Sequence, residues 1–549
     1  MSRSFHLPLL LGLLFGSGLV VSGVAAQDVG GSQRSLRRQE QVIADVGGSQ
    51  RSLQRQEQGV AEWLERNRDR PPVVRAFVQR MPKGGDIHTH LSGAVYAEHY
   101  LEWAAADGYC VDPGTGAGTV KLVAPQDCGK VTTSFPATQL FKQTKTYDAL
   151  INQWSLRNLP FAGKPGHDQF FQAFEGFDLI SSSPTRRGDM VAEVANRAAS
   201  QHISYLELLL TTQGGPTRQL AQSLNVQSIK TKADFAEIRH QLLDKGLLKL
   251  VANGRQELDQ IEQQTAAALD CETTKSKPGC RVTIRFLQQT TRLRSPVEVF
   301  AQFVYAFELA KVDPRVVGIN LVAPEDHPIA LRDYTLQMEM LQFLRSQVPG
   351  IKVSLHAGEL TLGLVPPDDL RFHIRQAVEV AQADRIGHGV DILYEDDPFA
   401  LMELMRQRGV LVEICLTSNE TILNVQGQNH PFATYHTAGV PMTLASDDEG
   451  IARIDLSHEY HLAVLRHGMK YGDLKQLARN SLEYSFATGA SLWQSPQFTG
   501  MTAACANDMP GSKALSKDCN VFLKGSDRAR LQWQLETDFA TFEALPWLR

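Results

Sequence analysis

Three short segments, far apart in the chain, carry three histidines and an aspartate that can bind one divalent metal ion. The segments are 86–90 (Asp-Ile-His-Thr-His), 354–359 (Ser-Leu-His-Ala-Gly-Glu) and 445–448 (Ala-Ser-Asp-Asp). His88 and His90 are two residues apart in a predicted strand, so their imidazoles project to the same side and can share an ion. Three imidazole nitrogens and a carboxylate oxygen suit Zn²⁺, with a position left for water. The first hypothesis is a metal hydrolase with these ligands: His88, His90, His356 and Asp447.

Each segment also has a simpler explanation when it is taken alone. A His-x-His pair on an apolar strand is more often structural than a pair of ligands. Asp447 and Asp448 could begin a helix or lie in a solvated turn. The metal hypothesis is favoured because all the candidate ligands fall at the ends of strands that belong to one regular series.

That series consists of apolar or β-branched runs, each bounded by turn residues. The runs are 83–90, 204–210, 282–289, 316–322, 352–359, 385–391, 410–416 and 441–447. Amphipathic stretches predicted to be helices lie between most of them, for example 296–310, 331–347, 367–383 and 398–408. This alternation is typical of parallel βαβ units. It predicts an α/β fold, a (β/α)8 TIM barrel, in which catalytic groups lie at the carboxyl ends of the strands.

Four motifs between residues 81 and 490 are shared with a known family. They are 81–94 (MPKGGDIHTHLSGA), 356–359 (HAGE), 385–389 (RIGHG) and 446–448 (SDD). With them the chain resembles the metal-dependent adenosine deaminases, within the amidohydrolase superfamily. The Pro-Lys-Gly-Gly run and the long upstream segment are more similar to the secreted, growth-factor-related branch, or to a bacterial exported branch, than to the compact cytosolic enzymes.

The resemblance implies zinc-dependent hydrolytic deamination of adenosine, or of a close 6-aminopurine nucleoside, to inosine and ammonia. One Zn²⁺ per chain would be held by the four ligands and would activate water at neutral pH. Glu359 would be the acid that protonates N1 of the purine, and His388 would orient or deprotonate the attacking water. The resemblance places these residues against the substrate: His90, Ser92, Ala323 and Asp448.

Two of these positions depart from the family pattern. Ser92 stands where many relatives have an aspartate that recognises the ribose 5′-hydroxyl, and Ala323 stands where a glycine N–H meets N3 of the purine. A backbone donor survives the second change. Glu359 has an alternative role as a partner of a ligand histidine. His388 lies between Gly387 and Gly389, which favours an accessible imidazole close to the backbone.

Composition and the amino terminus indicate an exported globular enzyme. Arg3 precedes an apolar run, 7–21, which ends in Val-Ala-Ala before Gln27; this pattern predicts a signal peptide over residues 1–26. The run is short for a spanning helix, so we expect no stable membrane insertion after the leader is removed. With 549 residues, 43% of them hydrophobic, and a net charge of −5, the chain can bury a large core and has no basic excess for nucleic acid. We expect a periplasmic or secreted protein.

The seven cysteines fit the same compartment. They suggest three disulfides that each close a short loop, Cys110–Cys128, Cys271–Cys280 and Cys505–Cys519, with Cys415 as a buried thiol. Zinc binding by cysteines is not expected, because no Cys-x-x-Cys spacing occurs.

The predicted organisation has five parts. After the signal peptide come a flexible segment at 27–60, in which residues 28–36 recur as 45–53, and a helical lead-in at 61–80. The barrel spans 81–490, with loop insertions near 105–135 and 255–281, and a tail at 491–549 packs on the barrel. Nothing in the sequence argues against a homodimer.

Two other functions stay open. One is another zinc amidohydrolase reaction, such as deamination of adenine or of a 5′-modified adenosine, and Ser92 keeps it open. A two-metal hydrolase is disfavoured because the strand 316–322 offers no lysine for a bridging ligand. The other is a non-enzymatic secreted binding protein, which would need none of the predicted ligand, acid and base residues together.

Overall fold

The computed structural model describes residues 54–114, 119–224, 226, 229, 231–512 and 514–546. The predicted signal peptide and most of the predicted flexible segment lie outside these residues. No helix among the described residues is long and apolar enough to cross a membrane.

Eight strands form one parallel sheet that curls into a nearly closed barrel. The order is β1-β5-β6-β7-β8-β9-β10-β11, so each strand pairs with the next one in the series. The two edges meet at a bridge between Thr89 and Asp447, where Asp447 N–H donates to His88 O at 3.0 Å and His90 N–H donates to Asp447 O at 2.9 Å. The strands are β1 (Gly84–His90), β5 (Ile203–Leu210), β6 (Thr283–Thr291), β7 (Val316–Val322), β8 (Lys352–Ala357), β9 (Arg385–His388), β10 (Leu411–Ile414) and β11 (Met442–Leu444).

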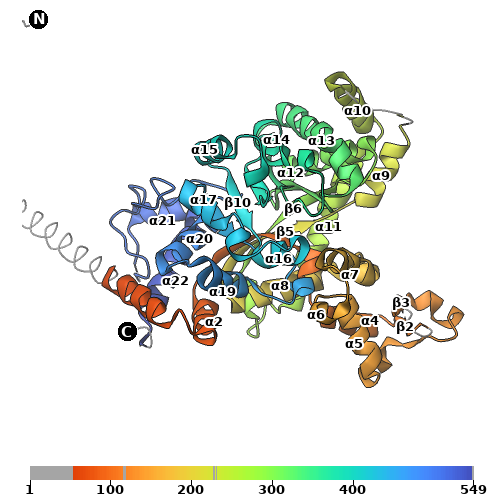
Figure 1. Ribbon diagram of the computed structural model, residues 1–549, viewed down its shortest axis with the longest axis horizontal. Coiled ribbons are helices and arrows are strands. Elements are labelled where there is room, and N and C mark those ends of the chain that lie inside the picture. Colours follow the sequence, from red (N-terminus) through yellow and green to blue (C-terminus); the bar gives the residue numbers. More distant parts are fainter. Residues whose placement is uncertain are drawn as a thin grey trace, which may run out of the picture. The chain divides into compact units, whose positions relative to one another are not determined.

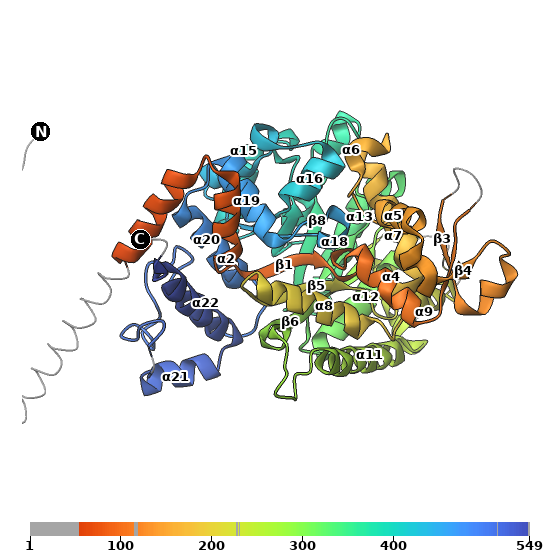
Figure 2. The ribbon, with the colours of Figure 1, turned by 90° about the horizontal axis from the view of Figure 1, so that it is seen from below.

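Helices surround the strands, as Figures 1 and 2 show. Those that connect or follow the barrel strands are α8 (Arg187–Ser200), α9 (Gly214–Gln222), α10 (Lys232–Asp244), α11 (Leu247–Ala268), α12 (Pro296–Val312), α13 (Pro328–Gln347), α14 (His373–Glu379), α15 (Pro398–Arg408), α16 (Leu416–Leu423), α17 (Phe432–Ala438), α18 (Glu449–Ala452), α19 (Leu456–His467) and α20 (Tyr471–Glu483). This alternation confirms the predicted (β/α)8 barrel.

Local sequence explains where the helices begin. Ser295 and Glu298 form a capping box at the start of α12, and Pro296 occupies its first turn. The helix predicted over 367–383 is shorter in the structure. A 3-10 turn, Pro367–Leu370, comes first, and α14 begins where Glu395 accepts the N–H groups of Ile374 and Arg375 at 2.6 and 3.1 Å.

A long insertion between β1 and β5 carries helices and a small sheet. The helices are α3 (Leu91–Ala94), α4 (Ala97–Ala106), α5 (Thr144–Gln153), α6 (Leu159–Ala162) and α7 (Gly166–Ser181). The antiparallel sheet consists of β2 (Cys110–Asp112), β3 (Lys121–Val123) and β4 (Phe135–Pro136), and it lies at the periphery in both ribbon views (Figures 1 and 2). The insertion matters for function because α7 returns to the barrel mouth.

Of the two carboxyl-terminal helices, the second packs on α20 and the first packs on the second. They are α21 (Lys517–Lys524) and α22 (Asp527–Glu543). Arg479 forms a bidentate ion pair with Glu536 at 2.7 Å, and Phe539 and Phe542 are buried. At the other end of the described chain, α2 (Pro71–Arg80) leads into β1 and contacts α19.

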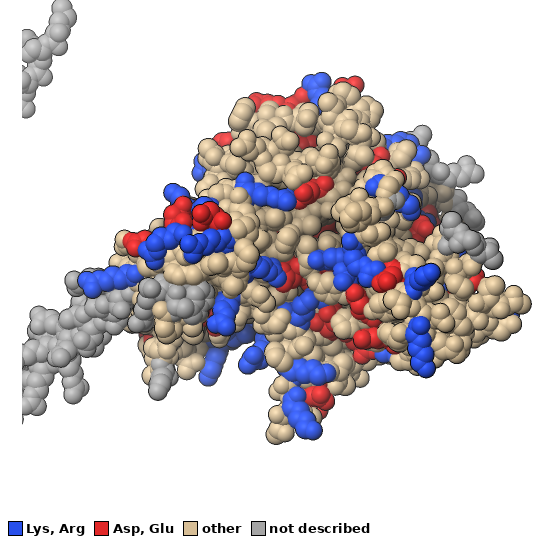
Figure 3. Space-filling view, turned by 60° about the horizontal axis from the view of Figure 1, so that its bottom comes forward, with Lys and Arg blue, Asp and Glu red and all other residues tan. Residues whose placement is uncertain are grey.

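The three predicted disulfides, Cys110–Cys128, Cys271–Cys280 and Cys505–Cys519, are confirmed, and Cys415 is a buried free thiol. On the face shown in Figure 3, basic and acidic side chains are interspersed. The exposed charges on this face therefore create no extended field of one sign.

Candidate metal and substrate site

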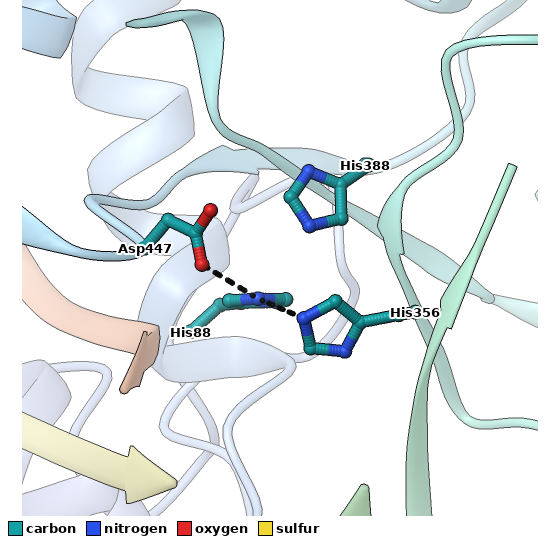
Figure 4. Close-up of side chains that lie close together, drawn as sticks. All are labelled: His88, His356, His388 and Asp447. Carbon is teal, nitrogen blue, oxygen red and sulfur yellow. Dashed lines mark hydrogen bonds and ion pairs between the residues drawn. The ribbon is translucent and has the colours of Figure 1, made fainter. Parts of the chain in front are cut away.

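Side chains from β1, β8 and the turn after β11 converge at the carboxyl end of the barrel. Nε2 of His356 lies 3.2 Å from Nε2 of His88 and 3.1 Å from Nε2 of His90. Oδ1 of Asp447 lies 3.5 Å from Nε2 of His88 and 3.3 Å from Nε2 of His90. Figure 4 shows His88, His356 and Asp447 facing one another, with His388 beside them. The structure thus brings the four predicted ligands together.

The outer nitrogen of each predicted ligand histidine contacts an oxygen. Nδ1 of His88 lies 2.6 Å from Oε2 of Glu413, Nδ1 of His90 lies 2.6 Å from Oε1 of Gln289, and Nδ1 of His356 lies 2.7 Å from Oδ1 of Asn320. These oxygens accept hydrogen bonds, so each Nδ1 carries a proton, and in the neutral ring each Nε2 directs a lone pair inwards.

Three lone pairs and a carboxylate oxygen cannot satisfy one another by hydrogen bonds. A divalent cation among them satisfies all four, and nitrogen with oxygen ligands in this ratio is a donor set that zinc favours. The residues present therefore fit a single metal ion held by His88, His90, His356 and Asp447.

Two glycines make room for this arrangement. A Cβ on Gly387 would lie 2.6 Å from Cε1 of His88, and a Cβ on Gly93 would lie 1.5 Å from Oδ1 of Asp448. Both separations are shorter than non-bonded atoms allow, so any side chain at either position would displace a residue of the site. Three non-glycine residues at the site also have left-handed backbone: Ala323, His388 and Asp447, with φ of 88°, 69° and 58°.

Glu359 follows β8, and its side chain lies beside the predicted ligands. Burial and the negative charge of Asp447 raise its pKa well above the ordinary value for glutamate. The same two causes raise the pKa of Asp448, whose Oδ1 is buried without a hydrogen-bond partner among the described residues. These shifts favour the protonated form of both carboxyls, and in that form each can donate a proton or a hydrogen bond.

His388 ends β9 with its imidazole fully buried. Burial lowers its pKa to about 4, so the ring is neutral at physiological pH. Nδ1 of His388 lies 2.9 Å from the side-chain nitrogen of Asn419. The ring can accept or donate a proton at the centre of the site.

A cavity of about 390 Å³ opens onto these groups. Apolar side chains from α7 and the β7–α13 loop form much of its wall: Phe170, Phe171, Phe174, Val322, Ala323 and Pro324. Ser92 also lines it, with His90, His356, Glu359, His388, Asp447 and Asp448. The structure thus brings every predicted substrate-binding residue to one cavity. None of the described residues that line it is a lysine or an arginine.

A larger cavity, of about 1140 Å³, lies at the amino ends of β8 to β11. Its wall includes many charged and polar side chains, such as Lys352, Asp384, Arg408 and Arg528. It lies at the opposite end of the strands from the histidine cluster, so it does not share the chemistry described above.

Sequence analysis missed several partners of the site. Glu413, Gln289 and Asn320 hold the ligand histidines, and Glu325 accepts the N–H groups of Gly358 and Glu359 at 3.2 and 2.8 Å. One signal was available for Glu413: it is the sole charged residue of the apolar run 410–416, and a buried charge needs a partner.

Comparisons with known sequences point to one family. The family model described as "Adenosine deaminase" matches residues 156–491, more than half of the chain. An adenosine deaminase of Erwinia tasmaniensis is 33% identical over 145 residues, which cover 26% of this chain and 40% of that protein. One of Clostridium perfringens is 26% identical over 186 residues, which cover 33% of this chain and 52% of that protein. The chain thus spans about half or less of the length of these curated relatives.

Two solved structures also align with the chain. The Arabidopsis N6-mAMP deaminase is 20% identical, with a TM-score of 0.49, and the alignment covers 75% of this chain and 96% of that one. The adenine deaminase of Arthrobacter aurescens is 17% identical, with a TM-score of 0.47, and the alignment covers 74% and 94% of the two chains.

Proposed function

Because the chain belongs to the adenosine deaminase family, we propose that it is a zinc-dependent hydrolase that converts adenosine, or a close 6-aminopurine nucleoside, to inosine and ammonia. The observation that carries this proposal is the convergence of the Nε2 atoms of His88, His90 and His356 on Asp447, beside the buried carboxyl of Glu359.

The proposed reaction adds water across the purine C6–N1 bond and then expels ammonia. Bound zinc would supply Lewis acidity and make water a nucleophile at neutral pH. Glu359 donates its proton to N1 as the oxygen adds to C6, since burial favours the protonated form of that carboxyl. The hydroxyl proton then leaves with the amino group as ammonia, and the other proton of the water restores Glu359. Asp448 donates a hydrogen bond to N7 from its own protonated carboxyl.

The chain's cavity also supports a nucleoside over a nucleotide. Its wall contains three carboxyl groups, Glu359, Asp447 and Asp448, and the described residues that line it provide no cationic side chain to pair with a phosphate. The apolar wall from α7 suits the faces of a neutral purine ring. A phosphate at the sugar 5′ position would lack a counter-charge there.

Ser92 favours one second candidate, deamination of adenine or of a 5′-modified adenosine. A serine lines the cavity where relatives recognise the 5′-hydroxyl with an aspartate, so that contact is neutral here. The three disulfides support the further proposal that the protein works in an oxidising compartment, in the periplasm or outside the cell.

The test uses the purified full chain. We expect one zinc per chain by elemental analysis and loss of adenosine absorbance on incubation. AMP should show at least ~100-fold lower kcat/KM, because burying a phosphate without a counter-charge costs several kcal/mol. A protein that binds zinc but deaminates neither adenosine nor adenine nor a 5′-modified adenosine would contradict the proposal.

A further inference from the structure

His388 differs from the predicted ligand histidines in the partner of its Nδ1 atom. The ligands each face an oxygen with Nδ1, whereas Nδ1 of His388 faces the side-chain nitrogen of Asn419 at 2.9 Å. Within the part of the chain that the structure describes, Nε2 of His388 has no hydrogen-bond partner. The ring lies across from His356 and Asp447 (Figure 4), and one of its nitrogens lies within 4.8 Å of their ligand atoms.

The orientation of Asn419 follows from a backbone group. The N–H of Phe432 donates to Nδ1 of His430 at 3.1 Å, and a backbone N–H can only donate. Nδ1 of neutral His430 is therefore unprotonated, and the ring proton is on Nε2. That Nε2 lies 3.0 Å from Oδ1 of Asn419 and donates to it. The amide NH₂ of Asn419 is then the group that faces His388.

The surroundings hold this chain of hydrogen bonds in one state. Asn419, His430 and Phe432 are all buried, with exposed fractions of 0%, 2% and 0%. Burial, with the nearby His467 and His388, lowers the pKa of His430 to about 3, so its ring stays neutral across the physiological range. Glu359 is the competing partner of His388, but its Oε1 is 3.6 Å from Nδ1, beyond hydrogen-bond range.

We propose that the Phe432 N–H, His430 and Asn419 form a relay that keeps the proton of neutral His388 on Nε2. His388 then meets the reacting atoms as a hydrogen-bond donor, whereas the three ligand histidines present lone pairs. Asn419 and His430 are positioning residues, because they act through His388. The position of the proton follows from the contacts alone, whereas its role in catalysis rests on the proposed function.

In the proposed reaction, a hydrogen-bond donor at Nε2 of His388 can stabilise the charge that develops on the attacking oxygen. Negative charge develops on the oxygen that adds to C6, and a fixed N–H aimed at that oxygen stabilises it without reorganisation. A ring with the opposite tautomer would present a lone pair to the same oxygen and repel it. The relay therefore favours hydrogen-bond donation over proton abstraction as the first role of His388.

NMR can show directly which ring nitrogen of His388 carries the proton. Full-length, zinc-loaded protein with ¹⁵N-labelled histidine is examined by NMR, and the signals of His388 are assigned from their loss in His388→Asn. We expect a protonated Nε2 and an unprotonated Nδ1 at neutral pH. A wild-type spectrum with the proton on Nδ1 would overturn the relay.

Asn419→Asp replaces the hydrogen-bond donor that faces His388 with an acceptor of the same shape. A carboxylate can only accept, so the proton of His388 should move to Nδ1, and kcat for adenosine should fall roughly 100-fold, as when a donor to an oxyanion is removed, while KM changes little. Asn480→Asp is the matched control: Asn480 is buried and its amide donates to Met442 O at 2.7 Å, away from the histidine cluster. The control should lose stability but keep the signals of His388.

Different results would contradict the relay and the proposed function. Unchanged His388 signals in a folded Asn419→Asp protein would contradict the relay. A wild-type protein with the expected tautomer but no deamination of any aminopurine would support the relay and overturn the proposed function.

Discussion

The carboxylate of Glu413 joins a predicted metal ligand to a buried arginine: Oε2 lies 2.6 Å from Nδ1 of His88, and Oε1 lies 2.5 Å from Nε of Arg385. Arg385 in turn lies 2.6 Å from Glu207, and all four side chains are buried inside the barrel. Arg385 therefore supplies the counter-charge for Glu413, which it shares with Glu207, and the position of Glu413 fixes the ring of His88.

Glu413→Gln should weaken zinc binding roughly 10- to 100-fold, the usual effect of removing a carboxylate behind a ligand histidine. The affinity is measured by competition with a chromophoric chelator. Glu395→Gln is the control, because it also alters a buried carboxylate, but one that caps α14. Equal zinc affinity in the wild type and Glu413→Gln would show that His88 is held by other contacts.

Removing a predicted metal ligand should weaken zinc binding more than Glu413→Gln does. His88→Ala, His356→Ala and Asp447→Ala should each lower zinc occupancy and abolish turnover, since the four ligands share one ion. Elemental analysis and the adenosine assay measure the two effects. His240→Ala changes a histidine whose side chain is 72% exposed, and it should alter neither. Full zinc and wild-type rate in any ligand variant would refute the assignment of that ligand.

Glu359→Gln tests the proposed acid. The amide keeps the shape of the side chain but cannot protonate N1, so kcat should fall at least ~100-fold while zinc content and substrate binding persist. Steady-state kinetics with adenosine separate the two constants. An unchanged kcat with a raised KM would mean that Glu359 only binds the substrate.

Glu325→Gln tests how Glu359 is held. The carboxylate of Glu325 accepts both N–H groups of the turn after β8, and an amide can satisfy only one of them. We expect kcat to fall about tenfold or more through misplacement of Glu359, and amide hydrogen exchange over residues 356–360 to become faster. Glu395→Gln should destabilise the fold comparably without faster exchange in that segment. Wild-type exchange in Glu325→Gln would rule out this role.

The sugar contact is tested with substrates. Ser92 is neutral and can turn to water, so 5′-deoxyadenosine should lose no more than ~1–2 kcal/mol in kcat/KM relative to adenosine, about one neutral hydrogen bond. 2′-Deoxyadenosine is the matched comparison. A loss of several kcal/mol would show that another residue recognises the 5′-hydroxyl.

Sequence patterns predicted the barrel because apolar or β-branched runs alternate with amphipathic stretches along the chain. They also predicted that the candidate ligands meet, since His88, His90, His356 and Asp447 fall at strand ends that a barrel brings together. The shortened α14 could not be predicted, because its start depends on Glu395, which lies beyond the helix in sequence.

The side chains that contact the predicted ligand histidines could not be predicted from the sequence for a similar reason. Gln289 and Asn320 are common polar residues with no spacing that marks them, and they meet His90 and His356 only because the curled sheet brings strands that are distant in sequence together. His430 likewise belongs to no motif in the sequence. It is buried, and its hydrogen bond with Asn419 depends on how α16 and the following loop pack.

The bridge between Thr89 and Asp447 has a consequence for how the protein is made. The first and last barrel strands meet at Thr89, which lies between His88 and His90, and at the predicted ligand Asp447, so the ligand set is incomplete until the ribosome has passed Asp447. A nascent chain that stops earlier keeps an open sheet edge on β1 and lacks the carboxylate ligand. Capture of the proposed metal ion would therefore be a late event in biogenesis, after nearly the whole barrel has been synthesised and its ends have met.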